Sequence, residues 1–221
     1  MDWAAPSAIE RLAAARVYFV CEGRPGGRNP GELLDAALAG GVDIIQLREK
    51  APRSADEMAA LAEPFRRAAD AHGALFFVNE RPDLVAPCGA DGVHVGQDDM
   101  SVAEARRIAG PSALVGLSTH SAAQFDAAAT APGEARPDQI SVGPVWETPT
   151  KQGRPAAGLE LVEHAALASH TPPWFAIGGI DLDTVAQVKA AGATRAVVVR
   201  AIRDAPDPEA AARSLREALD G

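Results

Sequence analysis

The chain has 221 residues, 47% of them hydrophobic, which is enough for one sizeable core and favours a single domain spanning residues 1–221. Its formal net charge of −9 argues against a general nucleic-acid binder or a protein of anionic membrane surfaces, because both usually present a basic face. Two cysteines are too few for a disulfide framework, residues 1–16 contain no apolar signal core, and no segment approaches the roughly 20 apolar residues of a membrane span. A cytoplasmic location is therefore expected.

Eight short apolar runs, rich in β-branched residues, recur along the chain with Ala-rich helical stretches between them. The predicted strands are Val17–Val20, Asp43–Leu47, Leu75–Val78, Gly92–Val95, Leu114–Leu117, Gln139–Val142, Trp174–Ile177 and Ala196–Val199. An additional helix is predicted before the first strand, at about Ser7–Ala15. Strands and helices that alternate throughout a chain imply parallel strands joined by crossover helices.

Helix boundary signals support this division. A serine stands three residues before Glu or Gln at Ser54, Ser101 and Ser121, which is the spacing of a capping box. Glycines follow Ala-rich stretches shortly before three of the strands, at Gly41, Gly89 and Gly192. Eight such units with an added N-terminal helix favour an α/β fold of the (β/α)8 TIM-barrel type. A doubly wound sheet more often carries a glycine fingerprint after its first strand, and Glu22–Gly27 is a poor match to it.

The second predicted strand runs into polar residues in the segment Asp43–Lys50. Side chains at alternate strand positions point the same way, so Gln46, Arg48 and Lys50 point together if the strand extends that far. An amide and two cations on one side predict an anion site, and a solvated strand end is the plain alternative. Lys50 is one of only three lysines in a chain that otherwise uses arginine, which suggests that a compact ammonium is needed there.

Active sites of TIM barrels lie on the loops that follow the carboxyl ends of the strands. The unusual polar residues of this chain gather at those positions. In strand order they are Asn79 and Glu80, then Gln97, Asp98 and Asp99, then Ser118, Thr119 and His120, then the run from Gly143 to Lys151, then Gly178 and Gly179, and finally Arg200. We therefore expect these residues to meet the second-strand residues in one pocket.

Several of these residues have both a structural and a functional interpretation. The segment Gly178–Asp181 is either a tight turn with a helix cap or a place where phosphate meets bare backbone N–H groups at a helix N-terminus. The segment Thr148–Lys151 is either a surface loop or a polyphosphate site built from hydroxyls, amides and an ammonium. Both alternatives stay open at this point.

Glu80 and Asp99 are either solvated surface charges or ligands of Mg²⁺, which usually takes one or two carboxylates together with waters and substrate phosphates. Ser118 either helps its loop enter the next helix or faces the pocket. His94 alternates with Val93 and Val95, so a hydrogen-bonded interior histidine is favoured over a ligand-binding one. His120 is open between a loop donor and a surface residue.

Taken together, the motifs resemble the thiamine phosphate synthase family over nearly the whole chain. The segments that carry the resemblance are Asp43–Lys50, Val78–Arg81, Gly89–Asp99, Gly116–Ser118, Val142–Pro144, Thr148–Lys151 and Ala176–Ile180. The resemblance implies a TIM-barrel transferase of thiamine biosynthesis that condenses 4-amino-2-methyl-5-(diphosphooxymethyl)pyrimidine with a thiazole phosphate. Its products are thiamine phosphate and diphosphate, and its partners are these small molecules, with no nucleic acid or membrane and no predicted oligomeric state.

The resemblance also implies roles for individual residues. The pyrimidine diphosphate would be contacted by Gln46, Arg48, Lys50, Asn79, Ser118 and Lys151. Of these, Lys151, Arg48 and Lys50 would stabilise the leaving group and are the expected catalytic residues. Thr148 and Thr150 would lie beside the thiazole substrate, whose phosphate would be bound by Gly179, Val199 and Arg200. Glu80 and Asp99 would hold Mg²⁺.

Two residues depart from the family pattern. Glu80 stands where the family usually has Asp, so its carboxylate reaches one methylene further. Arg200 stands where many members have Ser, which adds a guanidinium that either grips the thiazole phosphate or points away. The alternative functions are a thiazole tautomerase of similar fold and a barrel that binds a phosphorylated ligand without turning it over.

Overall fold

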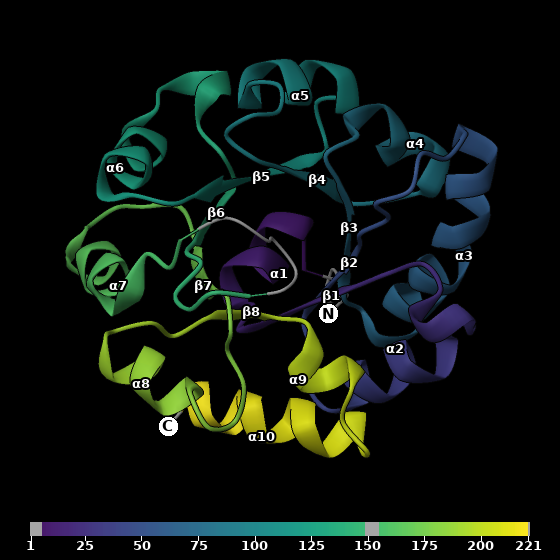
Figure 1. Ribbon diagram of the computed structural model, residues 1–221. Coiled ribbons are helices and arrows are strands. Elements are labelled where there is room, and N and C mark those ends of the chain that lie inside the picture. Colours follow the sequence, from purple (N-terminus) through teal and green to yellow (C-terminus); the bar gives the residue numbers. More distant parts are fainter. Residues whose placement is uncertain (1–5, 149–154, 221) are drawn as a thin grey trace, which may run out of the picture.

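The computed structural model describes residues 6–148 and 155–220, in which eight strands form a closed ring surrounded by helices (Figure 1). The strands are β1 Val17–Cys21, β2 Ile44–Leu47, β3 Leu75–Asn79, β4 Gly92–Val95, β5 Leu114–Thr119, β6 Gln139–Val142, β7 Trp174–Ile177 and β8 Ala196–Val198. The helices are α1 Ala8–Ala14, α2 Gly31–Ala39, α3 Ala55–His72, α4 Val85–Cys88, α5 Val102–Ala109, α6 Ala122–Thr130, α7 Gly158–Leu167, α8 Val185–Ala190, α9 Arg200–Arg203 and α10 Pro208–Asp220.

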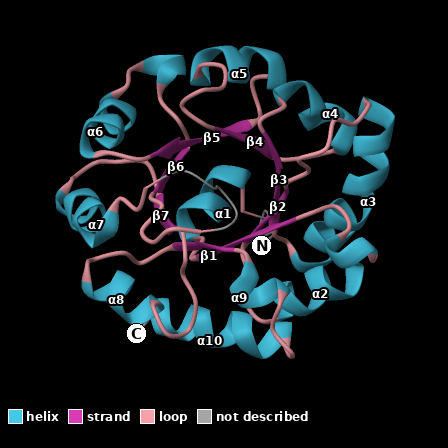
Figure 2. Cartoon of the chain, in the orientation of Figure 1, coloured by secondary structure: helices cyan, strands magenta, loops and turns pink. Residues whose placement is uncertain are grey.

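The ring is closed by β1, which pairs with β2 on one side and with β8 on the other. Every neighbouring pair is parallel, and each strand is followed by helical segments that lie outside the ring (Figure 2). The predicted TIM barrel with an additional N-terminal helix is therefore confirmed. The predicted strand ends differ from the observed ones by at most two residues, which is the usual uncertainty of such boundaries.

Alternating side chains of the strands pack on two sides of the ring. In β1, Tyr18 and Val20 belong to the cluster inside the barrel, whereas Val17, Phe19 and Cys21 pack between the barrel and the helices. All five residues are buried, which explains why the strand reads as a continuous apolar run and not as an alternating one. The barrel interior is thus a packed core below the carboxyl ends of the strands.

Helix α1 lies across the amino-terminal end of the barrel, where Figure 1 shows it within the ring of strands. Its Leu12 and the following Ala15 pack in the interior cluster. Arg195, just before β8, holds this helix by donating to the carbonyls of Ala13 and Ala15 at 2.9 and 3.0 Å. The amino-terminal end is therefore covered, and the opposite end is left for a ligand.

Three aspartates tie together the amino-terminal ends of the strands, each standing directly before an even-numbered strand. Asp43, Asp91 and Asp138 accept from the backbone N–H at or near the start of the preceding strand, at Val17 (3.0 Å), Phe76 (2.8 Å) and Val115 (2.7 Å) respectively. Each carboxylate also pairs with an arginine of an outer helix, namely Arg216, Arg66 and Arg106. Each aspartate thus joins two adjacent strands to the helical layer.

The predicted helix boundaries are largely confirmed. Ser54 forms both halves of a capping box with Glu57, while Ser101 and Ser121 cap α5 and α6 by accepting from the backbone N–H three residues on. The glycines at 41, 89 and 192 all have positive φ. No helix in the described residues is long and apolar enough to span a bilayer. Cys21 and Cys88 are buried free thiols.

Candidate active site

A cavity of about 320 Å³ opens at the carboxyl ends of the strands, within the size range of small-molecule sites. Residues from every strand or from the segment after it line its wall. Among the predicted substrate-binding residues, those on the wall are Gln46, Arg48, Asn79, Ser118, Thr148, Gly179, Val199 and Arg200. The prediction that these scattered residues meet in one pocket is therefore borne out for this set.

Gln46 lies inside the barrel at the base of the cavity. Only 4% of its surface is exposed, and its side-chain amide donates to the hydroxyl of Tyr18 at 2.7 Å. Tyr18 packs edge-on against Phe175 and tilted against Phe77, so an aromatic layer supports the amide from below. Burial raises the pKa of Tyr18 well above its ordinary value, so this phenol is neutral at physiological pH.

Strand β2 ends at Leu47, so the expected alternation does not run as strand to Lys50. The backbone N–H of Arg48 still bonds to the Cys21 carbonyl at 2.9 Å, and its side chain lines the cavity. The chain then turns, because the Glu49 carboxylate accepts from the N–H of Ala51 at 3.1 Å. Lys50 is exposed and is not among the described residues that line the cavity.

Ser118 is the fifth residue of β5 and is held from two directions. Its hydroxyl oxygen lies 2.8 Å from Nε2 of His94, and its backbone carbonyl accepts from the Gln97 side chain at 2.7 Å. His94 is 8% exposed and also contacts Gln139, which lies two strands away on β6, so it is confirmed as a hydrogen-bonded interior histidine. Ser118 faces the pocket and is not merely part of the loop into α6.

The opposite wall comes from β7 and β8 and the segments after them. Gly178 and Gly179 have φ of 105° and 72°, and a Cβ added to Gly178 would lie 2.5 Å from Pro144, so only glycine fits this turn. The hydrogen bonds of this segment agree with the interpretation as a tight turn with a cap. The Asp181 carboxylate accepts from the N–H groups of Asp183 and Thr184, and α8 begins after this turn, at Val185.

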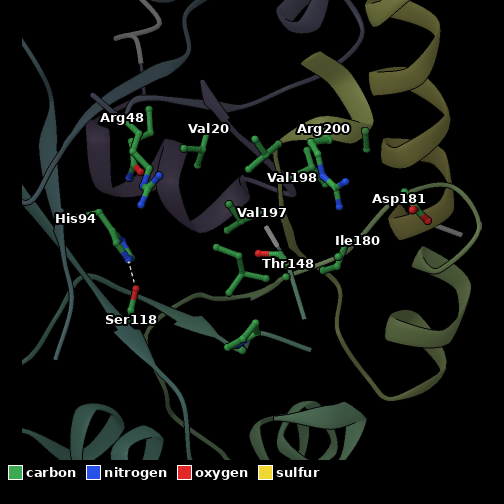
Figure 3. Close-up of a pocket in the computed structure, with 18 of the residues that line it drawn as sticks. Val20, Arg48, His94, Ser118, Thr148, Ile180, Asp181, Val197, Val198 and Arg200 are labelled. Atoms are coloured by element: carbon green, nitrogen blue, oxygen red, sulfur yellow. Dashed lines mark hydrogen bonds between the residues drawn. The ribbon is translucent and has the colours of Figure 1, made fainter. Parts of the chain in front are cut away.

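Val199 and Arg200 follow β8 and line the same wall as Gly179. Figure 3 shows Arg48, His94 and Ser118 on one side of the cavity and Arg200, Ile180 and Asp181 on the other. Arg48 follows β2 and Arg200 follows β8, the two strands that flank β1 in the ring, and both side chains line the same cavity. Thr148, at the end of the described segment, lies between these walls in the same view.

The two predicted metal ligands follow adjacent strands, and both are exposed. The N–H of Glu80 donates to the His94 carbonyl at 2.8 Å. The backbone of Glu80 has φ of 62°, a conformation that residues other than glycine rarely adopt. One Asp99 oxygen accepts from the Gly96 N–H at 2.7 Å. Such strain in a residue with a Cβ commonly marks a functional position.

The described residues contain no group of three or more His, Cys, Asp or Glu side chains that could hold a metal ion. Glu80 and Asp99 are exposed carboxylates that follow adjacent strands. Two such carboxylates fit Mg²⁺, which keeps several waters and uses few protein ligands, and they do not resemble a closed all-protein cage. Two further predicted residues, Thr150 and Lys151, lie outside the described residues.

His120, which the sequence left open between a loop donor and a surface residue, lines the cavity. Its Nδ1 lies 2.5 Å from the Gly143 carbonyl, and because a carbonyl only accepts, Nδ1 carries the proton. Sequence reasoning missed two contributors to the site. Tyr18 supports Gln46, and Gln139 contacts His94 from behind the wall. Tyr18 and Gln139 are polar residues within buried strands, and this feature of the sequence could have pointed to them.

Fold and site together define a TIM-barrel protein with a ligand cavity at the mouth, lined by arginines, a serine hydroxyl and a glycine turn. The sequence profile of the family described as thiamine monophosphate synthase matches residues 17–202. The chain is 50% identical to a thiamine-phosphate synthase of Arthrobacter sp. (strain FB24), covering 95% of this chain and 96% of that protein. It is 52% identical to one of Thermus thermophilus, covering 93% and 98%. The chain belongs to the thiamine monophosphate synthase family and acts as an enzyme of thiamine biosynthesis.

Solved structures agree with this assignment. The thiamine phosphate pyrophosphorylase of Pyrococcus furiosus superposes with a TM-score of 0.81 at 29% identity, covering 96% of this chain and 97% of that one. A 3-hexulose-6-phosphate synthase superposes with a TM-score of 0.63 at 22% identity, covering 92% and 99%, which shows the fold alone. The family resemblance predicted from the motifs is therefore confirmed.

Proposed function

We propose that this enzyme joins 4-amino-2-methyl-5-(diphosphooxymethyl)pyrimidine to a thiazole phosphate. The bond between the pyrimidine CH₂ and the diphosphate oxygen breaks, and its electron pair leaves with diphosphate. The electron-rich aminopyrimidine stabilises the resulting cation, and the lone pair of the thiazole nitrogen then forms the new C–N bond. The step needs little acid–base chemistry and much neutralisation of the departing charge.

The observation that carries the proposal is the division of the predicted residues between two walls of one cavity. Gln46, Arg48, Asn79 and Ser118, from β2, β3 and β5, form the side proposed for the pyrimidine diphosphate. Gly179, Val199 and Arg200, after β7 and β8, form the side proposed for the thiazole phosphate. Two substrates held on facing walls bring the CH₂ carbon and the ring nitrogen together, as a condensation requires.

On the pyrimidine side, the guanidinium of Arg48 is suited to the diphosphate because it can donate two parallel hydrogen bonds to phosphate oxygens. Gln46 accepts or donates at the pyrimidine ring through the part of its amide that Tyr18 does not use. We extend the catalytic role to Lys50 and Lys151, whose ammonium groups would add positive charge at the mouth, and we assign Thr150 with Thr148 to the thiazole side.

Glu80 and Asp99 are the proposed holders of Mg²⁺, with the remaining ligands supplied by water and diphosphate. When bound, Mg²⁺ neutralises charge on the leaving group. The backbone N–H of Glu80 donates to the carbonyl of His94, which holds Glu80 next to β4. The Asp99 carboxylate is oriented by the Gly96 N–H.

Arg200 distinguishes the thiazole wall of this chain. The side chain lines the cavity next to Gly178 and Gly179, which line it as well and place no side chain there. Asp181 lines the same wall, and its carboxylate is engaged by the N–H groups of its own turn. Arg200 therefore gives this wall the positive charge that binding of a phosphate monoester needs.

Incubation of the purified protein with both substrates, with and without Mg²⁺, tests the proposal, and product is followed as thiamine phosphate and released diphosphate. Product that requires both substrates and Mg²⁺ is expected. Product absent under every metal condition, with the thiazole phosphate bound or isomerised, would instead indicate a binding barrel or a tautomerase.

In the same assay, Lys151→Ala is expected to lower turnover on the order of 10²-fold with unchanged folding, since one positioned cation contact is lost.

A further inference from the structure

Behind the pyrimidine wall, three polar side chains from adjacent strands form a chain of hydrogen bonds across the barrel interior. Ser118 Oγ lies 2.8 Å from His94 Nε2, and His94 Nδ1 lies 2.8 Å from the side-chain nitrogen of Gln139. The three residues are 7%, 8% and 0% exposed. Ser118 and His94 line the cavity, and Figure 3 shows the bond between them, whereas Gln139 is not among the residues on the wall.

The direction of these hydrogen bonds follows from the chemistry of the groups. An amide NH₂ only donates, so Nδ1 of His94 must be the acceptor from Gln139. A neutral imidazole with an unprotonated Nδ1 carries its proton on Nε2, and that proton is donated to Ser118 Oγ. The hydroxyl of Ser118 has then accepted a hydrogen bond and keeps its own proton to donate into the cavity.

Gly116 gives an independent indication that the barrel is built around this pair. A Cβ added at position 116 would lie 2.5 Å from His94 Nδ1 and closer still to the Gln139 amide nitrogen. Glycine in a strand interior is unfavourable, and it commonly marks a place where other groups approach closely. The side-chain oxygen of Gln139 has no hydrogen-bond partner in the described part of the chain, so its amide group serves His94 at the expense of its own acceptor.

We propose that Gln139 is a positioning residue, which holds His94 in the Nε2–H tautomer and thereby makes the Ser118 hydroxyl a hydrogen-bond donor to an acceptor atom of the pyrimidine diphosphate. The choice of substrate rests on the proposed function, and the tautomer does not. Gln139 acts through His94 and Ser118 and touches no substrate. Without its donor, both tautomers of His94 become accessible, and in one of them Ser118 turns its proton inward to Nε2.

A double-mutant cycle tests whether Gln139 acts through Ser118. Gln139→Leu is expected to lower kcat/KM for the pyrimidine diphosphate about tenfold, the value of roughly one hydrogen bond, with KM for the thiazole phosphate unchanged. In a Ser118→Ala background the same substitution is expected to have less than about a twofold effect, because the hydroxyl that it orients is gone. Gln139→Met replaces Leu if the first variant is unstable. If the loss of kcat/KM in the double variant equals the product of the losses in the two single variants, the proposal is overturned.

Nitrogen-15 NMR of the imidazoles tests the tautomer without substrate, with the His94 signals assigned by their loss in His94→Gln. In the parent protein Nε2 is expected to be protonated and Nδ1 not, and in Gln139→Leu this preference is lost. A protonated Nδ1 in the neutral parent imidazole would refute the assignment, even if the enzyme makes thiamine phosphate. A parent protein that makes no product but has the expected tautomer rejects the proposed function alone.

Thr119→Val is the matched control. The Thr119 hydroxyl is fully buried, next to Ser118 on β5, and donates to the Ser141 carbonyl at 3.0 Å. The expectation that Thr119 faces the pocket is wrong, because it is not among the residues that line the cavity. The substitution is nearly isosteric and removes one buried hydrogen bond, as Gln139→Leu does. It is expected to lower stability with kcat/KM and the His94 signals unchanged. A loss of kcat/KM equal to that of Gln139→Leu would assign both effects to the packing of β5 against β6.

Discussion

The two ends of the barrel use charged side chains in opposite ways. At the amino-terminal end, Asp43, Asp91 and Asp138 are each bonded both to a strand N–H and to an arginine of the outer layer. At the carboxyl end, Arg48 lines the cavity without a side-chain hydrogen bond or ion pair to any described residue. At one end the aspartates join strands to helices, and at the other Arg48 is available for a ligand.

This difference separates stability from function in space. A carboxylate that accepts from backbone N–H groups leaves those donors unsatisfied when it is removed, so its loss weakens the fold. A guanidinium at the cavity mouth has no such partner, so its loss leaves the fold nearly unchanged and removes binding energy for an anion. Substitutions at the two ends should therefore have opposite profiles, which can be measured as unfolding free energy and as activity.

The largest effect is expected for Arg48→Met, which keeps much of the apolar length of the side chain and removes its charge. Turnover should fall on the order of 10²- to 10³-fold, because a positioned donor to the departing diphosphate is lost. The free energy of unfolding, measured in urea, should change by less than about 1 kcal/mol. Near-normal turnover would remove Arg48 from the leaving-group site.

At the opposite end, Asp43→Ala is expected to lower the free energy of unfolding by about 2–3 kcal/mol. The carboxylate accepts from the N–H groups of Arg16 and Val17 at 2.7 and 3.0 Å and pairs with Arg216 at 2.9 Å, so several donors lose their acceptor. Turnover of the folded protein should stay within about twofold of the parent value. Asp220→Ala, which removes the more exposed partner of Arg216, is the control and should destabilise far less.

The same contrast explains what the sequence could predict. The alternation of apolar runs and helical stretches predicts the barrel, and β4, β6 and β7 begin and end where the runs do. The mouth residues are predictable because parallel strands bring their carboxyl ends to one edge whatever the details of packing. The residues that follow the eight strands can therefore be assigned to one pocket without knowledge of how their side chains pack.

Contacts that depend on barrel closure could not be predicted in this way. The bond from Gln46 to Tyr18 needs the register of β1 on β2, and the bond from Gln139 to His94 crosses the barrel interior past Gly116. The aspartates before β2, β4 and β6 were visible in the sequence, but their partners lie on other strands and helices.

Glu80→Gly is expected to separate strain from metal binding at the mouth. Glu80 has φ of 62°, and glycine adopts this conformation without the penalty of a Cβ, so the free energy of unfolding should rise by up to about 1 kcal/mol. The Mg²⁺ concentration for half-maximal activity should rise about tenfold or more, because one carboxylate is lost. Increased stability with an unchanged Mg²⁺ requirement would remove Glu80 from the proposed metal site.

The smallest effect is expected for an ion pair that lies near the mouth but bonds only to its neighbour. Arg81 and Asp83 form a bidentate pair whose side chains are each 49% exposed. The hydrogen bond from Arg81 is the main cause of the lowered pKa of Asp83. Because solvent screens such a pair, Asp83→Asn should change the unfolding free energy by less than about 0.5 kcal/mol at pH 7.

The pH dependence of this small difference has a definite sign. A carboxyl whose pKa is lower in the folded state stabilises the fold above its unfolded pKa, near 4, and this contribution is lost as the pH falls through the lower folded value. Urea unfolding of the parent and Asp83→Asn proteins at pH 7, 5 and 3 should therefore show a difference at pH 7 and 5 that shrinks at pH 3. A loss at pH 7 as large as that of Asp43→Ala would contradict the comparison, because proximity of charges alone would then stabilise as much as bonds to strand N–H groups.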